Sequence, residues 1–125
     1  MQNDITASFI PMWDKDGLTV QVMVEDAVKD DNDAVTVYVD TANSGKDDIT
    51  PLTVTVKRSE AAEVENGYQA TVKVPLAGLS VAKVIGMDVV VTNGDKTAAF
   101  NDLTGKQGTS SKYYAKVAMK PGVEE

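Results

Sequence analysis

The sequence predicts an all-β protein, an antiparallel β-sandwich of the jelly-roll or immunoglobulin-like kind. Residues 18–25 alternate strictly: Leu18, Val20, Val22 and Val24 point one way, and polar or exposed side chains point the other. This period of two is typical of a strand with one buried face. No segment shows the sustained period that an amphipathic helix needs. Roughly seven or eight such segments with regular turns indicate a sandwich.

The first half of the chain predicts strands at 5–12, 18–24, 32–40 and 52–57. Pro11 near the end of the first strand indicates an edge position, because proline cannot donate to a neighbouring strand. Segment 61–64 (Ala-Ala-Glu-Val) predicts at most one helical turn.

The second half predicts strands at 68–74, 84–92, 96–100 and 112–119. Strand 84–92 is apolar on both faces around residues 89–91, which predicts a central position. The turn Asn93-Gly94-Asp95 is a strong hairpin signal. We expect residues 1–120 to form a single module, followed by a polar tail at 121–125.

Composition excludes several classes of function. The 125 residues contain no His and no Cys, which removes a serine triad, thiol catalysis and the usual zinc or haem ligands. The net charge is −7 and Arg58 is the single arginine, so we expect no nucleic-acid partner. No apolar run is long enough for a membrane span, and we expect no signal peptide within the chain.

Acidic residues gather in the turns of one stretch, and two interpretations stay open. They are Asp26, Asp30, Asp31, Asp33, Asp40, Asp47 and Asp48. Calcium prefers such oxygen ligands, although no EF-hand spacing is present. The alternative is ordinary use of aspartate in turns, for solubility and edge protection.

Read in order, several motifs resemble family 9 carbohydrate-binding modules over roughly residues 5–120. The matching pieces are Trp13-Asp14 with Leu18-Thr19-Val20, Asn32-Asp33-Ala34-Val35, Gly67-Tyr68-Gln69-Ala70, and Phe100-Asn101-Asp102. The resemblance implies an extracellular β-sandwich attached to a bacterial glycoside hydrolase, often a xylanase. It also implies a terminal sugar held between two tryptophans, with calcium supporting the loops.

The family's sugar clamp does not carry over to this chain. The first tryptophan falls at Asp30 or Asp31, the acidic partner at Thr36, the arginine near Leu52 or Thr53, and the second tryptophan near Gln107. Because the chain has one Trp, a two-tryptophan clamp cannot form. The strand that usually leads the family is also absent, so the chain resembles a shortened member that lacks the two-tryptophan clamp.

Four aromatic residues are candidate sugar platforms, because pyranose faces carry C–H groups that lie against rings. They are Trp13, Phe100, Tyr113 and Tyr114. Each also has a packing interpretation: Trp13 as the plug of one end of the sandwich, and one of the two adjacent tyrosines as a core residue. Tyr38 and Tyr68 are in phase with strand faces and are interpreted as packing residues.

We therefore predict a non-catalytic, secreted module that binds plant polysaccharide such as xylan or cellulose, with calcium as an expected cofactor. Its expected partners are a saccharide and the neighbouring domains of a parent enzyme. Glycosidase activity is not expected, because the acids lie in turns and do not face each other across a cleft. The alternative is a structural or spacer module that has lost sugar binding.

Overall fold

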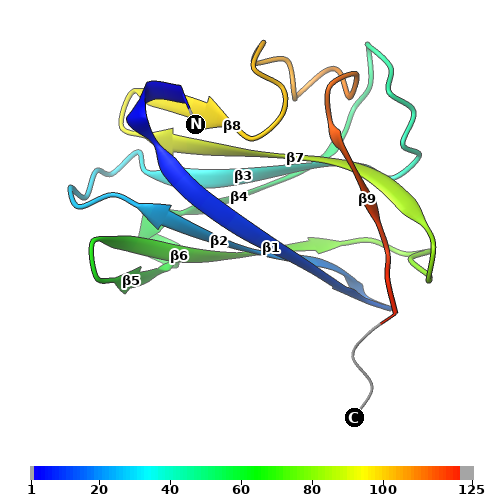
Figure 1. The fold of residues 1–125 in the computed structure, drawn as a ribbon, viewed down its shortest axis with the longest axis horizontal. Helices are drawn as coiled ribbons and strands as arrows, with labels where there is room; N and C mark the ends of the chain where they lie inside the picture. Colours follow the sequence, from blue (N-terminus) through cyan, green and yellow to red (C-terminus); the bar gives the residue numbers. More distant parts are fainter. Residues whose placement is uncertain (1, 122–125) are drawn as a thin grey trace.

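The computed structural model describes residues 2–121 as two antiparallel sheets packed face to face (Figure 1). The four-stranded sheet has the order β1-β2-β6-β5. The five-stranded sheet has the order β4-β3-β7-β8, and β9 also pairs with β7. The predicted antiparallel β-sandwich is confirmed.

Of the nine strands within residues 2–121, eight were predicted from the sequence. The four-stranded sheet contains β1 (Thr6–Asp14), β2 (Gly17–Glu25), β6 (Gly67–Pro75) and β5 (Ala62–Val64). The five-stranded sheet contains β4 (Leu52–Lys57), β3 (Ala34–Asp40), β7 (Val84–Asn93), β8 (Lys96–Ala99) and β9 (Ala115–Ala118). The helical turn predicted at 61–64 is wrong, because β5 pairs with β6 there. A short 3₁₀ helix, η2 (Arg58–Glu60), comes just before it.

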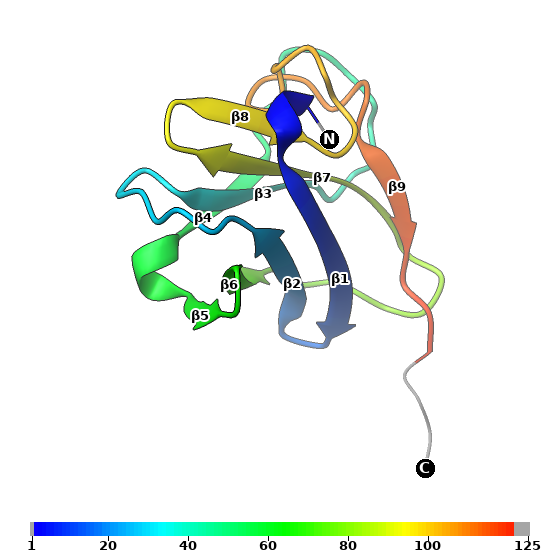
Figure 2. The same cartoon turned by 60° about the vertical axis from the view of Figure 1, so that its left-hand side comes forward.

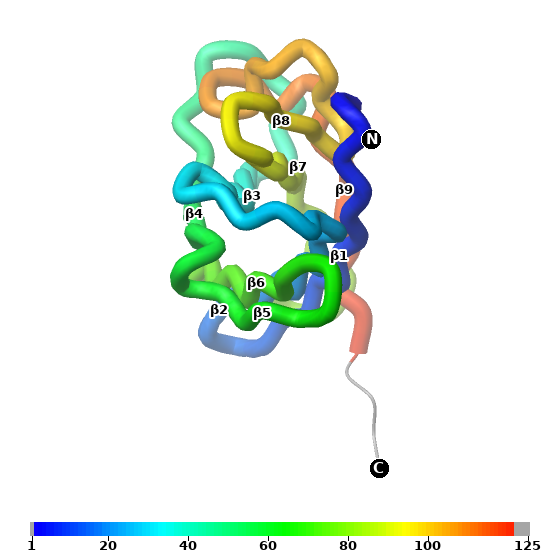
Figure 3. Tube along the Cα trace, turned by 90° about the vertical axis from the view of Figure 1, so that its left-hand side faces the viewer, coloured from blue at the N-terminus to red at the C-terminus, as the bar shows by residue number. Residues whose placement is uncertain are grey.

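Figure 3 shows the two sheets as separate layers, and valines supply most of the core between them. In β2 the alternate residues Val20 and Val22 are fully buried, while Met23 between Val22 and Val24 is exposed. β3 and β7 face them with Val35, Val37 and Val89, which are also fully buried. β2 and β3 therefore turn one row of side chains inward and the other row outward, whereas β7 is buried on both faces from Ile85 to Val89.

The N-terminal segment connects the two sheets (Figure 2). η1 (Gln2–Asp4) lies beside β8, where the Asn3 side chain donates to the Thr97 carbonyl over 2.7 Å. The chain then enters the four-stranded sheet as its edge strand β1, which confirms the edge position predicted from Pro11. Within residues 2–121, no helix has the length and apolar character needed to cross a bilayer.

Gly67 is a point where the fold leaves no room for a side chain. A Cβ added there would lie 2.0 Å from the Val24 carbonyl oxygen on the neighbouring strand. We expect Gly67→Ala to destabilise the fold by more than about 3 kcal/mol, because β2 and β6 must separate locally. Urea denaturation measures this change.

Gly108→Ala is the matched control, because its added Cβ would meet nothing within 4 Å. Its stability should lie within about 1 kcal/mol of wild type. Equal midpoints for the two variants would contradict the close approach at Gly67.

Candidate functional site

The predicted calcium-binding stretch contains a buried arginine centre. Arg58, which is 4% exposed, lies 3.2 Å from Asp26 and 3.0 Å from Asp33 through Nη1, and 2.8 Å from Glu63 through Nε. Its guanidinium also donates to the carbonyls of Asp26 and Val28. The Tyr68 ring lies 4.8 Å from the guanidinium carbon, within cation–π range.

This centre shifts the pKa values of its members in opposite directions. Burial alone would raise the pKa of Asp33, but hydrogen bonds from the Asp30 N–H, Arg58 and the Gly94 N–H outweigh it and lower that pKa. Burial raises the pKa of Asp26, whose carboxylate shares the site with Asp33. Burial also raises the pKa of Tyr68, to about 12.

The seven aspartates predicted as calcium ligands do not gather at one place in the structure. Within residues 2–121, no three acidic side chains are arranged to hold a metal ion. Asp33 is fully buried and Asp26 is largely buried, and both face a guanidinium that already supplies the positive charge.

Two of the remaining aspartates are held by serine hydroxyls. Asp40 accepts hydrogen bonds from Ser111 over 2.7 Å and from Ser44 over 2.8 Å. Asp47 accepts one from Ser110 over 2.7 Å. Asp30, Asp31 and Asp48 are exposed and form no ion pair with a residue in 2–121.

Trp13 lies at the seam between β1 and β9. It is partly buried against the core, and its Nε1 donates to the Lys120 carbonyl over 2.8 Å. It lines a groove of about 540 Å³ whose other walls are mostly aliphatic, including Met12, Leu18 and Val117. Since the indole N–H is already used, this groove offers a sugar an aromatic surface and few polar partners.

The other three aromatic candidates do not join Trp13. Phe100 packs edge-on against Phe9, with ring centroids 4.6 Å apart. Tyr114 is 8% exposed and its hydroxyl donates to the Gln107 carbonyl, so its ring has little surface to offer a sugar. Tyr113 beside it is 51% exposed, which confirms that one of the two adjacent tyrosines is a core residue.

The outward face of the five-stranded sheet brings together positions that the family resemblance singled out. Thr36 is paired with Thr55, and Tyr38 with Thr53, on the side opposite the buried valines. The hydroxyls of Thr36 and Thr55 lie 2.9 Å apart. We call this surface the threonine face: Thr36, Tyr38, Thr53, Thr55 and Val90, which pairs with Thr36 from β7.

A buried polar network borders the threonine face at Asp88, which pairs with Tyr38. The Asp88 carboxylate is fully buried and accepts hydrogen bonds from the N–H groups of Asn101 and Asp102 and from the Gln107 amide. Gln107, where the family's second tryptophan was expected, is therefore a structural residue. Burial and the Asp88 charge raise the pKa of Tyr38, which keeps its phenol neutral.

Tyr38 was assigned to packing from the sequence, and the structure corrects its place. Its side chain lies on the outward face and is partly exposed, whereas Tyr68 is fully buried as predicted. The sequence could have predicted this outward position, because Tyr38 stands between Val37 and Val39, which both point into the core.

We expect Asp33→Asn to destabilise the fold by about 2–4 kcal/mol at pH 7, because it removes one charge from a buried ion-paired centre. The native pKa of Asp33 lies below its ordinary value of 3.8. Its stabilising contribution is thus complete above that value and is lost as the pH falls through the native pKa.

Denaturant unfolding at a series of pH values measures this effect. The difference between Asp33→Asn and wild type should be constant near neutrality and shrink below about pH 4. Asp31→Asn, at an exposed position in the same loop, is the control and should leave stability nearly unchanged. A gap between Asp33→Asn and wild type that widened in acid would contradict the assignment.

Calcium binding stays a prediction, now limited to the exposed carboxylates Asp30, Asp31 and Asp48. An ion bound there raises the melting temperature, because it binds the folded state alone. Melts in calcium chloride and in EDTA, with wild type and Asp30→Asn, measure the shift. Identical melting temperatures in the two solutions would rule the site out.

Comparison with known proteins finds the same architecture in solved structures. No protein-family model matches the sequence, and neither does any curated protein. A family 9 carbohydrate-binding module from Caldicellulosiruptor kristjanssonii in complex with glucose matches with a TM-score of 0.87 at 17% identity, covering 100% of this chain and 82% of that one. A second structure of a family 9 module from that organism, in complex with cellotriose, matches with a TM-score of 0.83 at 16% identity, covering 99% of this chain and 80% of that one. The chain has the fold of family 9 carbohydrate-binding modules.

Proposed function

We propose that this chain is a non-catalytic carbohydrate-binding module that binds a neutral saccharide on its threonine face. The observation that carries the proposal is the convergence of Thr36, Tyr38 and Thr53 on one outward surface. Two solved structures with this fold hold glucose and cellotriose, which supports a saccharide as the ligand class.

The chemistry of the threonine face suits a sugar. Threonine hydroxyls both donate and accept hydrogen bonds, as sugar hydroxyls require. Tyr38 adds a partly exposed ring at the centre of the sheet, against which the C–H face of a pyranose can lie. The face lacks two facing tryptophans, so contact with sugar is one-sided and we expect weak binding.

Plant polysaccharide such as xylan or cellulose is the substrate class we propose, in a secreted protein attached to a glycoside hydrolase. In that setting the module raises the effective concentration of the catalytic domain near its substrate. Opposed carboxylates of the kind that hydrolyse glycosides are not part of this face, so the module binds without cleaving.

Calorimetric titration with cellotriose and xylotriose tests the proposal. Tyr38→Ala should weaken binding by about tenfold, the value of one lost ring contact with its hydrogen bond. Tyr113→Ala removes an exposed tyrosine that is not part of the threonine face and is the matched control. Binding that survives Tyr38→Ala unchanged would contradict this placement.

Trp13 provides a second readout, because it is the single tryptophan and lies away from the threonine face. Its fluorescence should stay constant while cellotriose binds. A saturable change in Trp13 fluorescence would instead locate the sugar in the groove beside β9.

A spacer module is the second candidate, and one observation favours it. Among the aromatic residues of 2–121, Tyr113 is the one that is more than half exposed, so the surface carries no row of rings. A wild-type protein that binds neither trisaccharide, nor insoluble xylan or cellulose, would support this candidate.

A further inference from the structure

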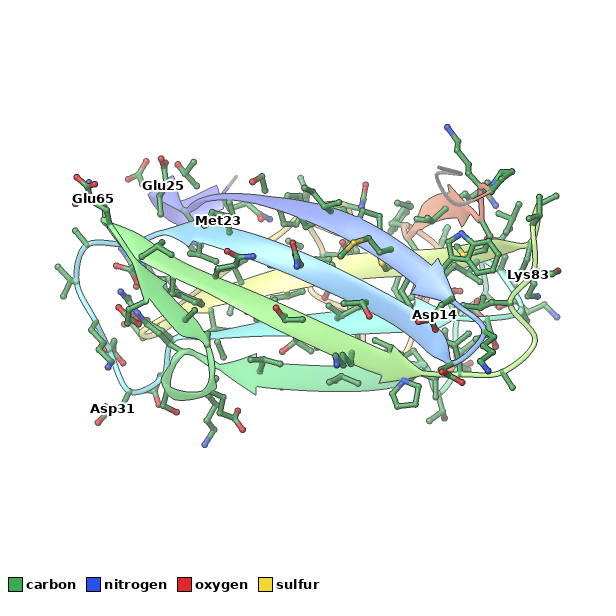
Figure 4. All side chains as sticks on the ribbon, turned by 90° about the horizontal axis from the view of Figure 1, so that it is seen from below. Asp14, Met23, Glu25, Asp31, Glu65 and Lys83 are labelled. Atoms are coloured by element: carbon green, nitrogen blue, oxygen red, sulfur yellow. The ribbon has the colours of Figure 1, made fainter. Side chains whose placement is uncertain are left out.

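Two buried aspartates have no basic side chain beside them. Most acidic residues of the chain lie at the surface, as Asp31 and Glu65 do in Figure 4. Asp88 and Asp102 are instead 0% and 1% exposed, and neither forms an ion pair with a residue in 2–121. The two are close neighbours, because the Asp102 N–H donates to the Asp88 carboxylate over 3.0 Å.

The fold balances its other buried pair of acids with a guanidinium. Asp26 and Asp33 both lie against Arg58. The Asp88 carboxylate instead accepts from main-chain and amide N–H groups, which carry no net charge. Because buried charges in proteins are paired with an opposite charge or coordinate a metal ion, the pair Asp88 and Asp102 lacks a counter-charge within residues 2–121.

One carboxylate oxygen of this pair has no partner. Asp102 Oδ1 accepts hydrogen bonds from the Thr104 N–H over 2.8 Å and from the Thr104 hydroxyl over 2.5 Å. Asp102 Oδ2 is buried and accepts no hydrogen bond from a residue in 2–121. A buried acceptor that stays unmet is costly, so this oxygen indicates a bound water or ion.

Asp102 lines a small cavity between β7, β8 and the loop 102–107. Its volume is about 60 Å³, and one water molecule needs roughly 10–15 Å³, so an ion fits there together with water. Gln107 lines the same cavity and donates its amide N–H groups to Asp88 and to the Asp102 carbonyl, which leaves its Oε1 free to accept. Leu103 and Gly105 also line it, and their carbonyls accept no hydrogen bond from a residue in 2–121.

The oxygens and the charge of this cavity select its occupant. Carboxylate, amide and main-chain carbonyl oxygens are the ligands that calcium, magnesium and manganese prefer. Within residues 2–121, no lysine or arginine lines the cavity, so no side chain repels a cation electrostatically. Water would satisfy Asp102 Oδ2 but leave two buried carboxylates without a counter-charge, whereas a divalent cation balances both.

We infer that Asp102 binds a hard divalent cation in this cavity, with Asp102 Oδ2 and Gln107 Oε1 as ligands and water completing the coordination shell. Asp88 is a positioning residue, because it holds the Gln107 amide and the Asp102 main chain. The site lies outside the acidic stretch 26–48 and does not rest on the proposed function. Val90 both lines the cavity and belongs to the threonine face, so the ion is held beside the proposed sugar surface.

Thermal melts of the full chain in EDTA, in calcium chloride and in magnesium chloride test the site. Wild type should melt about 5 °C higher in a saturating concentration of at least one of the two cations than in EDTA. Asp102→Asn should lose this rise, because the amide replaces the free carboxylate oxygen while keeping an acceptor for Thr104. Asp95→Asn, the same change at an exposed position in the turn between β7 and β8, is the matched control and should keep the rise.

Two results of the melts overturn the inference. A rise that survives in Asp102→Asn places the ion elsewhere, for example at the exposed aspartates. Equal melting temperatures of wild type in all three solutions leave water as the occupant of the cavity.

Crystals of wild type grown with manganese chloride locate the ion without relying on any variant. An anomalous difference peak within about 2.6 Å of Asp102 Oδ2 supports the site. A peak at another place alone, or no peak, overturns it even if Asp102→Asn fails to fold.

Discussion

The fold depends on one constraint, which is the alternation of side chains along the strands that face the core. Apolar residues at every second position of β2, β3 and β7 are removed from water between the sheets, and this burial is the main favourable term in folding. The same alternation places the intervening residues on the outer faces of the sheets. In β3 these residues include Thr36 and Tyr38 of the threonine face, whereas β7 is buried on both faces from Ile85 to Val89.

The Arg58 centre neutralises carboxylates that the fold buries at one end of the sandwich. The turn after β2 and the turn before β3 bring Asp26 and Asp33 into a poorly solvated space, where unpaired carboxylates are costly. A single guanidinium reaches both acids, a third on β5 and two main-chain carbonyls. Arginine is suited to this role, because its planar group donates in several directions and stays charged. The loop is therefore ordered by a side chain of the protein itself.

Local patterns in the sequence predicted the fold well. Most of the features that these patterns missed depend on contacts between residues far apart in the chain. Alternation found the strands because it depends only on neighbouring residues. β5 was missed because three residues, 62–64, are too few to show a period and include the second residue of the pair Ala61-Ala62, which favours helix. Arg58 and Asp33 lie 25 positions apart in the chain. The sequence therefore revealed the acidic stretch but not the arginine that pairs with it. The partly exposed ring of Tyr38 was readable from its valine neighbours, but the burial of Gln107 depends on a loop that no local pattern describes.

The two most deeply buried tyrosines limit the stability of the fold at alkaline pH. Tyr68 sits beneath Arg58, and Tyr114 donates its hydroxyl to the Gln107 carbonyl. Burial raises the pKa of both phenols above the ordinary value of 10, to about 12 for Tyr68. Once the pH passes that ordinary value, the unfolded chain releases protons that the folded chain still holds, and the balance tilts toward unfolding. Alkaline pH should therefore destabilise the sandwich at two places, the arginine centre around Tyr68 and the loop of Tyr114 that covers Asp88.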